Sequence, residues 1–155
     1  MVVRPTLDDR MRKALLELLK ASRKPFTLRV RGESMLPALA TDDEVRVTPC
    51  TAPEIEIGEI VAYHADRGIA VHRVLRRVTR DQAVKLYQAG DNLQGGSWLT
   101  DNQVVGKVTA VIRSNTDGKE PSGALTRREC WGRYAQIRVR ELVSRLLACF
   151  TPLVR

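Results

Sequence analysis

Between residues 26 and 111, apolar side chains recur at every second position in short runs, and turn-forming residues separate the runs. Such alternation is typical of β-strands that bury one face and expose the other. The runs cover residues 27–31, 44–47, 54–57, 60–64, 69–75, 83–88 and 104–111. Because the runs are short and closely connected, we expect a mainly-β fold, a small and strongly bent antiparallel barrel or sandwich.

Two of these runs, 60–64 and 69–75, flank a four-residue loop and predict a β-hairpin. In a regular hairpin with this loop, residue 64 pairs with residue 69, and residue 61 pairs with residue 72. Because side chains alternate along a strand, His64 and His72 then point to opposite faces of the sheet.

Both ends of the chain predict amphipathic helices. At the N-terminal end Thr6 is a candidate N-cap, and Met11, Leu15 and Leu18 recur at helical spacing. At the C-terminal end apolar residues share one stripe, and it comprises Trp131, Ala135, Val139, Leu142, Val143, Leu146 and Phe150. The expected organisation is an N-terminal helix (1–24), a β domain (25–113), a polar linker (114–126) and a basic C-terminal helix (127–155).

The positive charge is concentrated at the two ends of the chain. The net charge is +4 over residues 1–24, −1 over residues 25–126 and +5 over residues 127–155. A central body that is nearly neutral argues against nucleic acid as a partner. The C-terminal helix is expected to cover a face of the β domain; the alternative is peripheral contact with a membrane surface.

Several classes of protein do not fit this sequence. The three cysteines are odd in number and scattered, which argues against a disulfide framework or a zinc site. No apolar run reaches the ~18 residues that suggest a membrane span, and the N-terminus lacks the apolar centre of a secretion signal. We therefore expect a single cytoplasmic domain, with the inner membrane surface as the alternative location, and neither metal nor cofactor.

The strongest candidate for chemistry is Ser34, in the segment Gly32-Glu33-Ser34-Met35-Leu36-Pro37. A glycine before the serine allows a substrate backbone to approach closely, and Pro37 restricts the chain after it. Met35 offers an adaptable apolar wall to a small side chain. We therefore expect Gly32, Met35 and Pro37 to contribute to substrate binding.

A serine nucleophile needs a base, and His72 is the preferred candidate. His72 lies within an apolar strand, where burial favours the neutral imidazole that a general base requires. His64 borders the hairpin loop and faces the other way. Lys85 and Lys107 are the alternatives, since a buried lysine can also activate a serine.

A third group should orient the imidazole of the base. Asp91, in the turn Gly90-Asp91-Asn92, is the first candidate, and Asp101 is the second. For each of them, a purely structural role as a turn or cap residue is the competing interpretation.

Six short motifs follow one another between residues 27 and 112, and together they resemble the signal peptidase I superfamily, which includes the LexA-type self-cleaving repressors. The motifs are Gly32-x-Ser34-Met35-x-Pro37-x-Leu39, Asp43-x-Val45-x-Val47, Ile57-Gly58-Glu59-Ile60-Val61, His72-Arg73-Val74, Gly90-Asp91-Asn92 and Val105-Gly106-Lys107-Val108. A histidine in a His-Arg-Val context and a Gly-Asp-Asn motif are similar to the archaeal and endoplasmic-reticulum type. Bacterial-type members have a lysine at the position of the histidine.

The resemblance implies a serine endopeptidase that cleaves a peptide or protein precursor after a small residue, in a soluble form without membrane helices. Ser34 would be the nucleophile, His72 the base and Asp91 the supporting acid. One alternative is a peptidase-like domain without turnover that binds peptides or a membrane surface. A LexA-type self-cleaving regulator is disfavoured, because no Ala-Gly or Cys-Gly dipeptide precedes Ser34.

Overall fold

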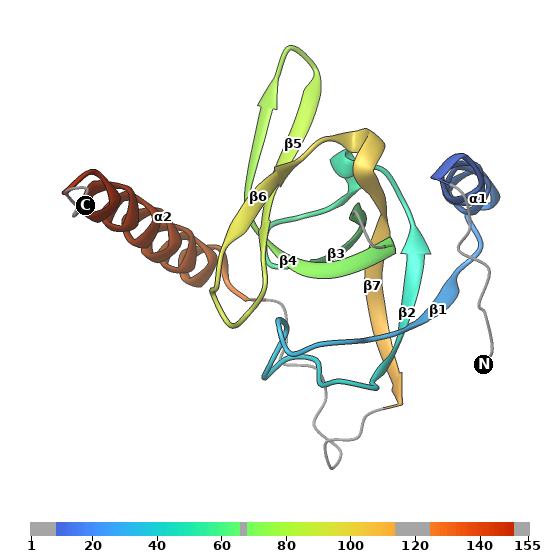
Figure 1. The fold of residues 1–155 in the computed structure, drawn as a ribbon. Helices are drawn as coiled ribbons and strands as arrows, with labels where there is room; N and C mark the ends of the chain where they lie inside the picture. Colours follow the sequence, from blue (N-terminus) through green and yellow to red (C-terminus); the bar gives the residue numbers. More distant parts are fainter. Residues whose placement is uncertain (1–8, 66–67, 114–124, 151–155) are drawn as a thin grey trace.

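A computed structural model describes residues 9–65, 68–113 and 125–150. Seven strands form one antiparallel sheet in the order β1-β2-β7-β3-β4-β5-β6, and the sheet curls strongly (Figure 1). The strands are β1 Phe26–Arg29, β2 Glu44–Pro49, β3 Ile60–Ala65, β4 Gly68–Arg80, β5 Ala83–Ala89, β6 Gly96–Leu99 and β7 Val104–Arg113. The expectation of a mainly-β fold with a strongly bent antiparallel sheet is confirmed.

The expected hairpin is formed by β3 and β4, with the expected register. His64 pairs with Ile69, and Val61 pairs with His72. The two histidines therefore lie on opposite faces of the sheet, as the alternation of side chains requires.

Two segments differ from the expected strands. Residues 54–57 form no strand, because Ala52–Glu54 (η1) make a 3-10 turn in which the Thr51 N–H donates to the Glu54 carboxylate (2.8 Å). Conversely, β6 was not among the expected strands, because its four residues are too few to show an alternating pattern. It forms by pairing with β5 across the turn that begins at Gly90. A second 3-10 turn, Asp101–Gln103 (η2), follows β6.

The core consists of three groups of buried side chains. One group, inside the curl, includes Ile55, Val61 and Leu86. A second includes Met35, Leu39 and Val45 and lies beneath the connection between β1 and β2. The third lies between the sheet and the C-terminal helix and includes Leu75, Tyr87, Ala89, Cys130 and Ile137. Ser34, which precedes the buried Met35, is therefore attached to the core.

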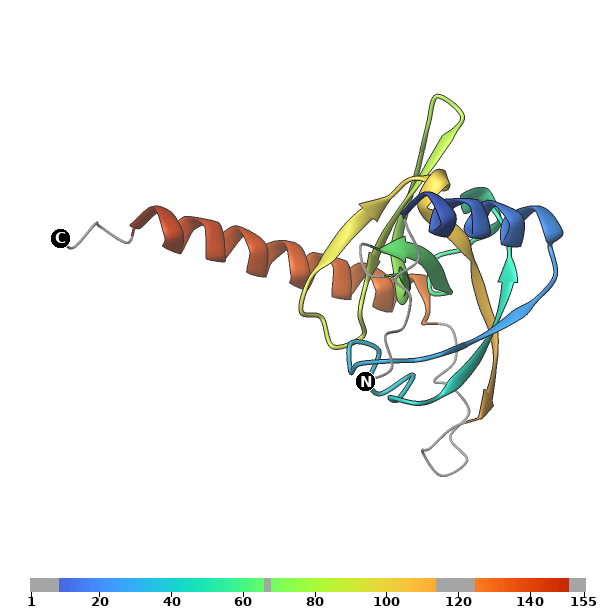
Figure 2. The same ribbon diagram turned by 45° about the vertical axis from the view of Figure 1, so that its right-hand side comes forward.

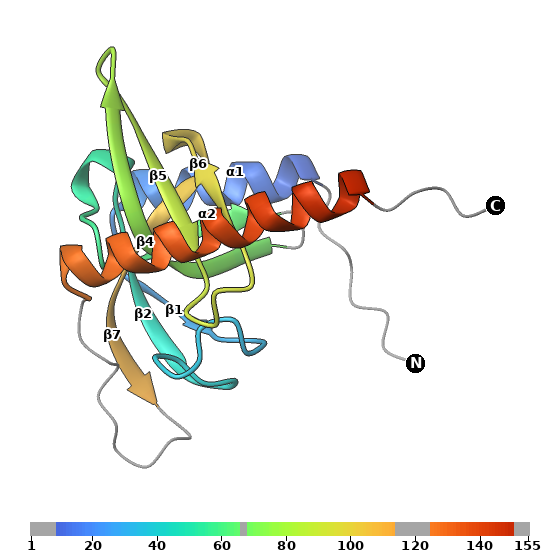
Figure 3. The ribbon, with the colours of Figure 1, turned by 90° about the vertical axis from the view of Figure 1, so that its left-hand side faces the viewer.

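Helices α1 (Asp9–Ser22) and α2 (Arg127–Phe150) lie at the two ends of the described chain. The expected N-cap Thr6 lies outside the described residues. Helix α2 crosses β4 and β5, and its C-terminal half extends beyond the sheet (Figures 2 and 3). Among the described residues, no helix is both long and apolar enough to cross a membrane.

The expected apolar stripe of α2 does not cover the β domain. The helix packs through Cys130, Tyr134 and Ile137 instead, whereas Trp131 and Leu142 of the stripe are exposed. A helix with two apolar faces can dock through either one. Here the face that carries Cys130, Tyr134 and Ile137 packs in the third core group. There the rings of Tyr134 and Tyr87 meet edge to face, with a centroid distance of 4.8 Å.

We predict that Leu86→Ala lowers the free energy of unfolding by about 2–5 kcal/mol, because it removes a side chain that is 0% exposed from the centre of the core. Ile112→Ala, at a position that is 47% exposed, should change it by less than about 1 kcal/mol. Urea denaturation of both variants measures this. Equal losses would contradict the assignment of the core.

Candidate active site

The connection between β1 and β2 carries Ser34 and is held by backbone hydrogen bonds at its base. The Val30 N–H donates to the Asp43 carbonyl (2.8 Å), and the Asp42 N–H donates to the Val30 carbonyl (3.0 Å). Asp42 adopts a positive φ of 71°, which aspartate tolerates better than most residues. Within the loop, Met35 is buried in the core, so the backbone beside Ser34 is anchored.

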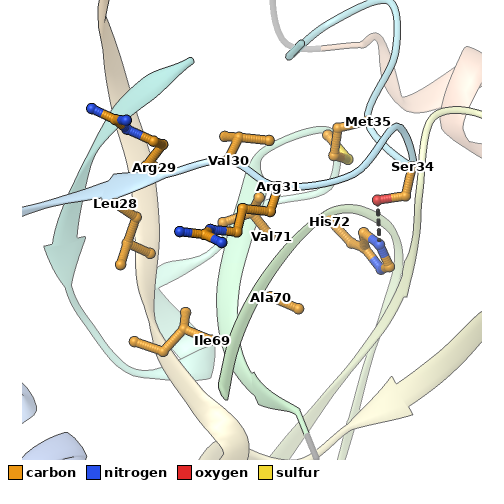
Figure 4. Close-up of a pocket in the computed structure, with 10 residues that line it drawn as sticks. All are labelled: Leu28, Arg29, Val30, Arg31, Ser34, Met35, Ile69, Ala70, Val71 and His72. Atoms are coloured by element: carbon orange, nitrogen blue, oxygen red, sulfur yellow. Dashed lines mark hydrogen bonds between the residues drawn. The ribbon is translucent and has the colours of Figure 1, made fainter. Parts of the chain in front are cut away.

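The side chains of Ser34 and His72 meet directly. The Ser34 Oγ lies 3.1 Å from the His72 Nε2, within hydrogen-bonding distance (Figure 4). His72 comes from β4, 38 residues further along the chain. The curl of the sheet brings the start of β4 beneath the loop that carries Ser34 (Figure 4). A serine nucleophile and its base would require a hydroxyl and an imidazole within this distance of each other.

Gln88 holds the other nitrogen of the imidazole. Its Oε1 lies 2.5 Å from the His72 Nδ1, and its Nε2 donates to the Ser97 Oγ (2.7 Å). With the amide in this orientation, Nδ1 carries the proton and donates it to Gln88. The Nε2 is then the acceptor for the Ser34 hydroxyl. The Tyr63 hydroxyl also contacts Nδ1, at 3.1 Å.

The surroundings of His72 favour the neutral imidazole. Burial lowers its pKa below the ordinary value of 6.5, and the hydrogen bond to Gln88 and the charge of Asp91 offset part of this shift. At neutral pH the ring is therefore unprotonated at Nε2, as a general base must be.

The expectation that Asp91 orients His72 is wrong in its geometry. The Asp91 carboxylate accepts hydrogen bonds from Arg73 Nε and NH2, both at 2.8 Å, and from Arg133 NH1, also at 2.8 Å. Side chains alternate along β4, so Arg73 points away from the face that His72 occupies. Asp91 lies on the side of Arg73, whereas Gln88 pairs with Val74 and shares the face of His72.

The turn Gly90-Asp91-Asn92 instead contacts the backbone carbonyl of Ser34. The Asn92 N–H donates to the Ser34 carbonyl (3.1 Å). A Cβ atom at Gly90 would lie 2.5 Å from the Ser34 carbonyl oxygen, so only glycine fits there. The ion pairs of the buried Asp91 hold this turn in place, and the pair with Arg133 connects the turn to α2.

The remaining candidates lie elsewhere. Asp101 accepts a hydrogen bond from the Ala52 N–H (2.6 Å). It therefore stabilises η1 and does not orient the imidazole of His72. Lys107 donates to Glu59 (2.8 Å), and Lys85 is exposed on β5. His64 occupies the opposite face of the hairpin. Among the described residues, no group of three or more His, Cys, Asp or Glu could hold a metal ion.

A cavity of about 190 Å³ opens beside the Ser34–His72 pair (Figure 4). It is lined by Leu28, Arg29, Val30, Arg31, Ser34, Met35, Ile69, Ala70, Val71 and His72. Of the three expected substrate-binding residues, Met35 lines the cavity, whereas Gly32 and Pro37 do not.

The cavity lies between two strand edges. In the described ranges, β1 pairs with β2 alone, and the pairing of β4 with β5 begins at Arg73. Residues 69–72 of β4 therefore have a partner strand on one side only, among the described residues. Each edge can pair with an extended peptide.

Comparison with known proteins adds no family assignment: no family model matches this chain, and no curated protein matches it.

We predict that this site makes folding stability depend on pH. The lowered pKa of His72 means that, as pH falls from about 6.5, the unfolded chain binds a proton before the folded protein does. The folding stability that depends on a neutral His72 is therefore fully present above about pH 6.5. It is lost as pH falls toward the pKa of His72 in the folded protein.

Urea denaturation across this pH window should show a steeper loss of stability for wild type than for His72→Asn, by about 1.4 kcal/mol for each unit of pKa difference. Equal slopes in the two proteins would contradict the burial of a neutral imidazole.

Proposed function

We propose that this protein is a serine endopeptidase of the signal peptidase type, which cleaves a peptide or protein precursor after a small residue. The observation that carries the proposal is the 3.1 Å contact between the Ser34 Oγ and the His72 Nε2 in the lining of a cavity. The six sequence motifs support it, because the structure gives several of them roles around Ser34.

In this mechanism the Ser34 Oγ attacks the scissile carbonyl while His72 Nε2 takes the hydroxyl proton. His72 then gives this proton to the leaving amine. In the second half of the reaction, water gives a proton to His72 and attacks the acyl group on Ser34, and His72 returns the proton to the Ser34 Oγ. The Ser34 backbone N–H would donate to the developing oxyanion, an interaction of about 3–4 kcal/mol in such sites.

Substrate would bind as an added strand between β1 and the start of β4. The backbone edges of residues 28–31 and 69–72 supply main-chain hydrogen bonds, and side chains of Leu28, Val30 and Met35 supply apolar contacts. A volume of about 190 Å³ is small beside the ~300–1,000 Å³ of pockets that hold drug-sized ligands. It suits a peptide with small side chains next to the cleaved bond.

A second candidate function is peptide binding without turnover. It is favoured by Gln88, because a neutral amide orients the imidazole but supplies no charge to stabilise the imidazolium that forms during catalysis. The same cleft would then retain an extended peptide without cutting it. The two functions differ in whether Ser34 reacts.

We predict that a fluorophosphonate probe labels the wild-type protein at Ser34, with the Ser34 Oγ displacing fluoride from phosphorus. Ser34→Ala should abolish labelling, and His72→Asn should slow it by at least about a thousandfold, since base and nucleophile act as a unit. Ser144→Ala, at an exposed serine of α2, is the matched control and should label normally. Mass spectrometry of the modified peptide identifies the site.

Unlabelled wild-type protein that still binds peptides would contradict the peptidase and support the second candidate. Cleavage of a peptide library, followed by sequencing of the products, then tests for the preference for a small residue before the cut.

We predict that Gln88 sets the tautomer of the base. Gln88→Leu should lower kcat by about 10²- to 10⁴-fold with little change in KM, because the Nδ1 proton loses its short hydrogen bond to Gln88. Gln88→Glu should retain activity and raise the pKa of His72, so the acid limb of the kcat profile moves to higher pH. A Gln88→Leu variant with wild-type kcat would show that Gln88 does not orient the base.

A further inference from the structure

Helix α2 has a second apolar face that points away from the sheet. We call it the outer stripe, and it consists of Trp131, Val139, Leu142, Val143 and Leu146. At about 100° per residue, these positions fall within about a third of the helix circumference. Trp131 and Val139 are each 61% exposed and Leu142 is 59% exposed, and no described residue covers them. Large apolar residues grouped in this way mark an interaction surface.

Arginines run along both borders of the outer stripe. Arg138 and Arg145, seven residues apart, follow one border, and Arg140 lies on the other. Arg140 and Arg145 are exposed and form no ion pair with another described residue. Within the described part of the chain, the ion pair that Arg138 forms is with Glu141 of the same helix, at 2.8 Å. Residues 127–150 contain six arginines and two glutamates, a net charge of +4.

This combination fits an anionic lipid surface better than a second copy of the chain. Two outer stripes packed together would bring arginine borders of the same sign side by side, which is unfavourable. At a lipid interface the apolar side chains enter the acyl region, and the arginines meet lipid phosphates. An indole ring such as that of Trp131 is well suited to the headgroup level. Figure 2 shows that the C-terminal half of α2 extends clear of the sheet, where a flat surface can reach it.

We propose that the outer stripe of α2 binds the surface of a membrane that contains anionic lipids, with the helix lying along the interface. The cavity beside Ser34 has no part in this contact, because none of the residues that line it belongs to α2. The proposal is therefore independent of whether Ser34 is a nucleophile.

Sedimentation of the full chain with vesicles tests the proposal. Wild type should bind mixed phosphatidylcholine–phosphatidylglycerol vesicles, and binding should weaken with added salt and on phosphatidylcholine alone. The double variant Leu142→Asp/Leu146→Asp should bind mixed vesicles at least about tenfold more weakly. The variant Arg140→Gln/Arg145→Gln should lose the preference for anionic vesicles.

Helix α1 supplies a matched control, because Leu15 and Leu18 are exposed leucines on the other helix, 47% and 67% exposed respectively. Leu15→Asp/Leu18→Asp makes the same change in net charge and should bind vesicles like wild type. Circular dichroism checks that each variant is folded, and fluorophosphonate labelling without vesicles should be the same in all of them.

Three results would overturn the proposal. The first is wild-type protein that does not bind mixed vesicles. The second is equal loss of binding in both aspartate double variants, which would show that net charge alone accounts for it. The third is concentration-dependent self-association of wild type that Leu142→Asp/Leu146→Asp abolishes, which would make a second copy the occupant of the stripe.

Discussion

The hydrogen bond between Ser34 and His72 depends on the curl of the sheet. His72 belongs to a strand whose pairing partners are far from β1 in the sheet order, yet the curl places it 3.1 Å from the serine hydroxyl. A flat sheet with the same register would separate the two groups by several strands, each about 4.8 Å apart. The bulges between β2 and β7, and between β4 and β5, accompany the bending that closes this distance.

Ser34 and His72 are held by different means. His72 is fixed by neutral hydrogen bonds on one face of the sheet, whereas Ser34 is fixed by a turn whose carboxylate is buried between two arginines. A buried charge cluster contributes little net stability, but it is costly to break and so fixes one arrangement of the turn. The ion pairs of Asp91 thereby hold the backbone at Ser34, whereas burial lowers the pKa of His72 and the hydrogen bond to Gln88 offsets part of that shift.

Much of this architecture could be predicted from sequence because it is encoded locally. The hairpin register followed from loop length, and the alternation of side chains then separated His72 from His64. Gln88 could not be found in this way, since a glutamine on a strand has no distinguishing pattern and its contact depends on the register between β4 and β5. For the same reason Asp91 was expected on the wrong side of β4. The face through which α2 docks was also not encoded locally, because both faces are apolar.

Nitrogen-15 NMR of the His72 ring measures the central claim most directly, because it reports which nitrogen carries the proton. At a pH above the pKa of His72, the Nδ1 should show the shift of a protonated nitrogen and the Nε2 that of a bare acceptor. The Nε2 resonance should move in Ser34→Ala, because its donor is lost. A proton on Nε2, or an Nε2 resonance that does not change in Ser34→Ala, would contradict the hydrogen bond from Ser34 to His72.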